Sequence, residues 1–110
     1  MLTHVVLLKP KAEITEDEIA RALDHVQALQ QAIPGIVSVE AGKNLNGSNQ
    51  GYTHGFVIRF ADAEIYKGYA PHPAHQPVSE ELRRISQSII DFDVACFTSR
   101  GYRLLIGVLG

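Results

Sequence analysis

Residues 66–77 constrain the fold of this chain most, because they place three prolines, two histidines and two tyrosines within twelve positions. Proline lacks a backbone N–H and fixes φ, so Pro71, Pro73 and Pro77 rule out one continuous α-helix across this stretch. The chain must bend there, and the bend holds histidines, which titrate near neutral pH. We therefore predict that the functional site lies at this bend.

The composition indicates one soluble globular domain. The 110 residues are 45% hydrophobic and 20% charged, with a formal net charge of -2, which allows a real core. So small a charge gives no electrostatic reason to expect nucleic acid or an anionic membrane as a partner. The single cysteine, Cys96, cannot form an internal disulfide, and neither a signal peptide nor a membrane-spanning run is recognisable. We expect a cytoplasmic protein.

Alternating hydrophobic patterns predict four strands and two helical regions. Thr15 and Glu18 form a capping box that begins a helix running to about Ile33. A short helix is predicted over 63–69, and a second helical segment begins at Ser79 and includes Ile89 in its apolar spacing. Strands are predicted at 2–9, 36–45, 52–60 and 90–97. This β-α-β-β-α-β order predicts an α+β, ferredoxin-like fold.

The burial pattern predicts a homodimer. In this fold the helices cover only one face of the sheet, yet the first and last strands are apolar on more than one side. A second copy of the same sheet is the simplest cover for the other face. Residues 1–97 form the domain, and residues 98–110 are an apolar extension that we expect to pack on the chain's own sheet or on the partner.

The bend suits aldol chemistry, in which a base removes a proton next to a carbonyl and a donor stabilises the resulting oxyanion. Histidine suits the first task and tyrosine the second, and Asp93 could hold an imidazole tautomer. Structural roles remain open for the same residues. His75 could instead begin a helix and bond to the backbone, and Tyr69 could be a core residue. His4 and His54 could be buried, hydrogen-bonded side chains, and His72 could be exposed.

Metal binding is the competing use of these histidines. The spacing His72-x-x-His75 would suit two ligands if the turn were helical, with Asp93, His4 or His54 as a third. No Cys/His array supports such a centre, and no glycine-rich nucleotide-binding loop occurs. We therefore expect neither a metal nor an organic cofactor.

Several motifs resemble the stress-responsive A/B barrel (Dabb) family over residues 1–97. They are residues 2–9, the turn at 33–35, the stretch 51–54, Tyr69, the run His72-Pro73-Ala74-His75 and the ending Asp91-Phe92-Asp93. The resemblance implies a ferredoxin-like monomer that dimerises sheet to sheet into a dimeric α+β barrel.

The resemblance also implies an activity, because one enzyme of that family closes a linear polyketide by aldol condensation without a cofactor. Its catalytic tyrosine and histidine fall on Tyr69 and His75, and two further histidines fall on His4 and His54. We expect Tyr69 and His75 to be catalytic, and the substrate to contact His4, His54, His72 and Asp93. The implied function is a small-molecule cyclase acting on a polyketide-like substrate. The alternative is a non-catalytic binding or protective homodimer.

Overall fold

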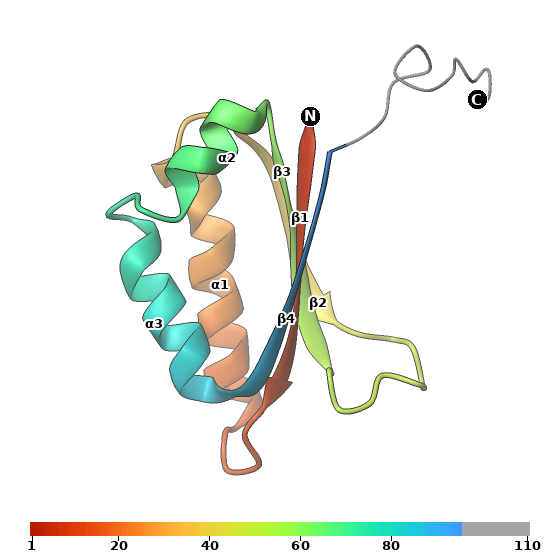
Figure 1. Ribbon diagram of the computed structural model, residues 1–110. Helices are drawn as coiled ribbons and strands as arrows, with labels where there is room; N and C mark the ends of the chain where they lie inside the picture. Colours follow the sequence, from red (N-terminus) through yellow and green to blue (C-terminus); the bar gives the residue numbers. More distant parts are fainter. Residues whose placement is uncertain (96–110) are drawn as a thin grey trace, which may run out of the picture.

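The computed structural model describes residues 1–95 and has the predicted ferredoxin-like α+β fold (Figure 1). The strands form one antiparallel sheet in the order β2-β3-β1-β4. The predicted extension at 98–110 and the end of the last predicted strand lie outside the described residues. The elements are β1 (Leu2–Pro10), α1 (Glu16–Ala32), β2 (Ile36–Lys43), β3 (His54–Phe60), α2 (Ala63–Tyr69), α3 (His75–Ile85) and β4 (Ser86–Ala95).

The core lies between the helices and one face of the sheet (Figure 1). Side chains alternate across a strand, so every second residue of β1 and β3 points at the helices. On β3 the predicted face of His54, Phe56, Ile58 and Phe60 is confirmed, since all four are buried. The capping box at the start of α1 is also confirmed. Each fully buried aliphatic or aromatic side chain contributes about 1.5–3 kcal/mol to this core.

The opposite face of the sheet carries no helix (Figure 1), and an apolar stripe on it runs along β4. Ile90, Phe92 and Val94 on β4 are 43%, 60% and 38% exposed. The residues that pair with Ile90 and Phe92 on β1 are Leu7 and Val5. We call these five residues the open sheet face. An exposed apolar stripe of this kind typically marks an interaction surface.

The bend between the two short helices forms as predicted. α2 ends at Tyr69, α3 begins at His75, and two backbone hydrogen bonds build the turn between them: His72 N to Tyr69 O (3.1 Å) and His75 N to His72 O (2.9 Å). The predicted start of the second helical segment at Ser79 is wrong, because α3 begins four residues earlier. Pro77 falls in the first turn of α3, where no intrahelical bond needs its missing N–H.

Three strand boundaries differ from the predictions by more than one residue, and β1 ends at Pro10, one residue later than predicted. β2 ends at Lys43 and β3 begins at His54, because residues 44–53 form a loop tied by asparagine side chains to nearby backbone groups. β4 begins at Ser86, so Ile89 belongs to the strand and not to the helix. Its i+4 spacing from Ile85 is compatible with a helix, but in the strand Ile89 packs against the same core.

Across residues 1–95, none of the helices has the length and apolar character that crossing a membrane requires.

Replacing Gly55 with alanine should destabilise the fold by about 1–3 kcal/mol, the usual cost of overpacking. A Cβ at this position would lie 2.5 Å from the backbone oxygen of Val6, which cannot move without disturbing the β1–β3 pairing. Urea unfolding at a fixed protein concentration measures the change. Gly42→Ala is the control, since Gly42 lies opposite Gly55 on β2 and a Cβ there meets nothing within 4 Å. Equal stability of the two variants would contradict the prediction.

Candidate functional site

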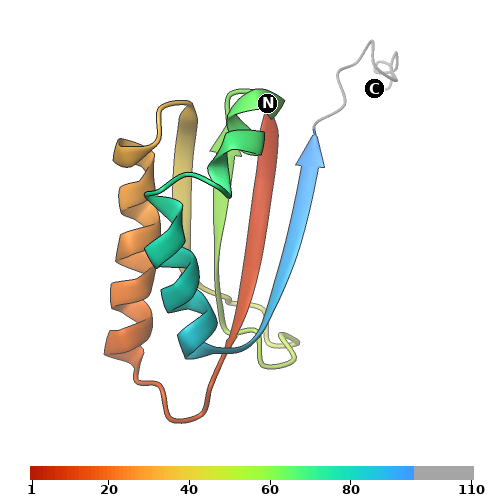
Figure 2. The same cartoon turned by 60° about the vertical axis from the view of Figure 1, so that its left-hand side comes forward.

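A cavity of about 510 Å³ lies between the α2–α3 bend and the β1–β4 side of the sheet. Both views place α2 near the N-terminal end of β1 (Figure 1, Figure 2). Four of the six predicted site residues, His4, Tyr69, His75 and Asp93, line this cavity together. Its other lining residues are Val6, Phe56, Tyr66, Lys67, Ala70, Ser79, Leu82, Arg83, Ile89 and Asp91.

Tyr69 and His75 face each other across the bend. Tyr69 is the last residue of α2 and is buried, whereas His75 is the first residue of α3 and is half-buried. Their ring centroids are 4.3 Å apart, with an interplanar angle of 53°. The bend thus brings one imidazole and one phenol into contact at the wall of the cavity.

His75 is poised to act as a base. Its Nδ1 lies 3.1 Å from the backbone oxygen of Ala70. A carbonyl can only accept, so Nδ1 carries the proton in the neutral ring and Nε2 retains a lone pair. Burial lowers the pKa of His75, the Ala70 carbonyl acts in the opposite direction, and the charges of His4, Arg83 and His72 lower the pKa further. The imidazole is therefore neutral at pH 7.

Tyr69 is poised to act as a hydrogen-bond donor. Burial raises the pKa of Tyr69 above its ordinary value, and the negative charge of Asp91 raises it further. The phenol therefore keeps its proton throughout the physiological pH range. The Tyr69 side chain lines the cavity, so its hydroxyl is placed to donate a hydrogen bond to a ligand there.

A second polar group lies on the sheet side of the cavity, where Asp93 receives two hydrogen bonds. Nδ1 of His4 donates to Oδ1 of Asp93, and the Tyr66 hydroxyl donates to Oδ2 at 2.5 Å. Burial alone would raise the pKa of Asp93, but these two bonds outweigh it and the pKa is lowered. The hydrogen bond between Tyr66 and Asp93 also raises the pKa of Tyr66. Asp93 thus stays ionised and fixes the Nδ1–H tautomer of His4.

The sheet register makes this arrangement possible. β1 lies between β3 and β4, and His4 is paired with Asp93 on β4. The His4 ring also packs near Tyr69, with centroids 5.7 Å apart. Tyr69 therefore lies close to two imidazoles, one from the first strand and one from the start of α3.

His54 and His72 do not line the cavity. His54 is buried at the other end of the sheet, where its ring nitrogens contact Thr53 Oγ1 (2.8 Å) and Glu16 Oε1 (3.4 Å). His54 pairs with Leu8 on β1, four residues from His4, which separates the two by roughly 13 Å along the strand. His72 lies in the turn, where its Nδ1 accepts a hydrogen bond from the Ala74 N–H (3.0 Å).

No group of three or more His, Cys, Asp and Glu side chains arranged for a metal ion occurs within residues 1–95. The two histidines of the His72-x-x-His75 spacing each use Nδ1 for a backbone contact in the turn. These contacts order the bend itself.

Tyr66 and Arg83 are among the cavity residues that the sequence predictions missed. Tyr66 precedes Tyr69 by three positions, and Arg83 follows His75 by eight, so helical spacing alone would have placed each on the same face as a predicted residue. Helical spacing was the available signal. It could not identify these two residues as part of the site, because charged and phenolic side chains are common on helix surfaces.

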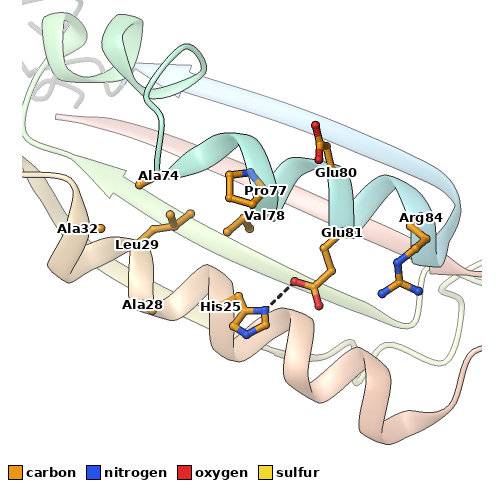
Figure 3. Close-up of a pocket in the computed structure, with 10 residues that line it drawn as sticks. All are labelled: His25, Ala28, Leu29, Ala32, Ala74, Pro77, Val78, Glu80, Glu81 and Arg84. Carbon is orange, nitrogen blue, oxygen red and sulfur yellow. Dashed lines mark hydrogen bonds and ion pairs between the residues drawn. The ribbon is translucent and has the colours of Figure 1, made fainter.

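A larger cavity of about 700 Å³ lies on the outer side of the helices, between α1 and α3 (Figure 3). Leu29, Pro77 and Val78 form part of an apolar floor. The polar contact across this groove is between His25 Nδ1 and Glu81 Oε1, 2.7 Å apart. The Tyr69–His75 pair does not line it, so the groove is separate from the candidate site.

Fold and site together define a small ferredoxin-like protein with a polar cavity between its helices and a four-stranded sheet. Residues 2–96 match the Stress responsive A/B Barrel Domain (Dabb), and the chain belongs to that family.

Two known protein sequences and one solved structure are similar to most of the chain. Olivetolic acid cyclase from Cannabis sativa is 32% identical over 92 residues, which cover 82% of this chain and 91% of that protein. A stress-response A/B barrel domain-containing protein from Arabidopsis thaliana is 30% identical over 101 residues, covering 87% and 88%. A dimeric ferredoxin-like protein of unknown function from Jannaschia sp. superposes with a TM-score of 0.77 at 28% identity, covering 86% and 98%.

Proposed function

We propose that this protein is a cofactor-independent enzyme that closes a polyketide-like chain into a ring by aldol chemistry. The contact between Tyr69 and His75 at the wall of a 510 Å³ cavity carries the proposal. The similarity to olivetolic acid cyclase supports it. A volume of this size suits a small organic ligand, for which pockets of about 300–1,000 Å³ are usual.

The proposed reaction uses only proton transfers and one new carbon–carbon bond. Nε2 of His75 removes a proton from a carbon between two carbonyl groups, and the resulting enolate carbon attacks a second carbonyl of the same chain. The attacked oxygen becomes an alkoxide, which the Tyr69 O–H stabilises by donating a hydrogen bond. The imidazolium then returns its proton to this oxygen. Because the proton is returned, this step consumes no external reactant.

The proposal includes a homodimer formed through the open sheet face. A stripe of large apolar side chains on β1 and β4 lacks a cover from residues 1–95. The dimeric description of the similar Jannaschia protein supports the same arrangement. A stable interface of standard size buries about 1,200–2,000 Å² in total.

A non-catalytic binding or protective role is the second candidate. The groove between α1 and α3 favours it, because that groove is apolar and its histidine is already paired with Glu81. The similarity to the Arabidopsis stress-response protein also supports it. Ligand binding without any turnover would favour this role over the first.

Turnover of a linear poly-β-ketone, supplied as a thioester or free acid, tests the proposal. Ring closure is followed by absorbance and mass spectrometry. Tyr69→Phe should lower kcat by roughly 10²–10³, the usual effect of losing one oxyanion donor. Tyr52→Phe is the control, since the Tyr52 hydroxyl bonds Ser88 Oγ at 2.9 Å and does not line the cavity. Ring closure no faster than the uncatalysed reaction across a panel of such substrates would reject the enzyme.

A further inference from the structure

Arg83 brings a positive charge to the cavity without an acidic partner of its own. It lines the cavity from α3, and its Nη1 donates to Ser79 Oγ at 2.7 Å. Over residues 1–95, no Asp or Glu oxygen lies within 4.0 Å of its guanidinium. The neighbouring Arg84 differs, because it faces the outer groove (Figure 3) and lies 4.0 Å from Glu18.

Helix geometry places the Arg83 guanidinium near the proposed base. His75, Ser79 and Arg83 are spaced four residues apart, so they lie one above another on one face of α3, roughly 6 Å apart along the axis at each step. Helical side chains lean toward the N-terminus of their helix, and the hydrogen bond to Ser79 holds Arg83 in that direction. The lowering of the His75 pKa by the Arg83 charge agrees with this placement.

Guanidinium groups bind planar anions well. Arginine presents several N–H donors in a fixed fork that matches a carboxylate, and such charge-assisted bonds are stronger than neutral ones. One N–H of Arg83 is used by Ser79, which leaves the others for a ligand. Ser79 also lines the cavity and adds a hydroxyl beside the guanidinium.

The opposite wall limits the charge of such a ligand. Asp91 on β4 lines the same cavity, and no cation of the described chain lies within 4.0 Å of it. Its carboxylate repels a doubly charged group such as phosphate more strongly than a singly charged one. It also accepts a hydrogen bond from an enol or hydroxyl group. The cavity therefore favours a singly charged anion that carries O–H or carbonyl groups.

We propose that Arg83 and Ser79 form a carboxylate subsite, and that the substrate is a free linear keto acid. Its carboxylate binds Arg83, and the rest of the chain extends toward the bend, where one carbon reaches His75 and a carbonyl reaches Tyr69. This assignment rests on the proposed function, because it names the substrate class of the same cavity.

Equilibrium binding to the full chain tests the subsite without requiring turnover. The probes are triacetic acid, a linear diketo acid, and its methyl ester, measured by calorimetry against wild type, Arg83→Gln and Arg84→Gln. Wild type should bind the acid about 10- to 100-fold more tightly than the ester, the usual gain from a hydrogen-bonded charge. Arg83→Gln should abolish this preference, whereas Arg84→Gln should retain it.

Three results would overturn the subsite. They are equal binding of acid and ester by wild type, no binding of either, and an unchanged preference in Arg83→Gln.

Coenzyme A alone serves as a competitor. Its displacement of the acid from wild type but not from Arg83→Gln would assign Arg83 to phosphate instead. Triacetic acid is too short to close a six-membered ring by aldol addition, so conversion is measured on a longer linear poly-β-keto acid. Such an acid that binds through Arg83 but is never converted would support the subsite and reject the cyclase. Conversion of a thioester by a protein that shows no preference for the acid over the ester would support the cyclase and reject the subsite.

Discussion

Replacing His75 with alanine should lower kcat for ring closure by about 10²–10⁴, the usual contribution of a positioned general base. The variant should still fold, because His75 is only half-buried at the first position of α3 and alanine is a good helix former. Circular dichroism and urea unfolding check the fold. His25→Ala is the control, since His25 is a histidine that lies in the outer groove beside Glu81 and does not line this cavity.

The pH dependence distinguishes a base from a merely structural histidine. Only the neutral imidazole accepts a proton, so the rate should fall as the pH decreases through the pKa of His75. Because burial lowers that pKa from its ordinary value of 6.5, the limb should lie below pH 6.5 and the rate should be flat above it. His75→Ala should remove this limb from the residual activity. A limb above pH 6.5, or one that persists in the variant, would contradict the assignment.

Replacing Phe92 with aspartate should break the proposed dimer. Phe92 is 60% exposed at the centre of the open sheet face, opposite Val5. A buried aromatic anchor contributes about 2 kcal/mol or more, and twofold symmetry counts it twice, so the dimer Kd should rise by roughly 10³-fold or more. Sedimentation at micromolar concentration should detect a dimer for wild type and a monomer for the variant.

Leu45→Asp controls for the general effect of adding a charge to an exposed apolar position. Leu45 is 93% exposed and lies in the loop between β2 and β3, outside the open sheet face. This variant should remain dimeric. A stable wild-type monomer at micromolar concentration, or a Phe92→Asp variant that stays dimeric, would show that the open sheet face is not the interface.

The fold followed from hydrophobic periodicity, but the site did so only in part. The alternation on β3 and the capping box on α1 are local signals, and both predicted their elements correctly. The start of α3 was harder to predict, because a proline such as Pro77 usually interrupts a helix but is tolerated in its first turn. Ser79 consequently looked like a better helix start than His75.

Strand register explains why His4 and His54 could not be separated from sequence alone. Both lie on apolar strands and both point toward the helices. The pairing of β1 with β4 places His4 opposite Asp93, and the pairing of β1 with β3 places His54 opposite Leu8, at the other end of the sheet. His54 there contacts Glu16 of α1. The two histidines look alike in the sequence because register is a long-range property.

The hydrogen bond between His4 and Asp93 joins residues 89 positions apart in the chain. A ribosome has therefore released the first strand long before the strand that completes the cavity wall exists. Contacts at such sequence separation form late, since the intervening chain must be closed into a loop before they can stabilise anything. A nascent or prematurely ended chain carries Tyr69 and His75 without the wall that faces them. The proposed proton chemistry would thus require a folded chain that includes Asp93.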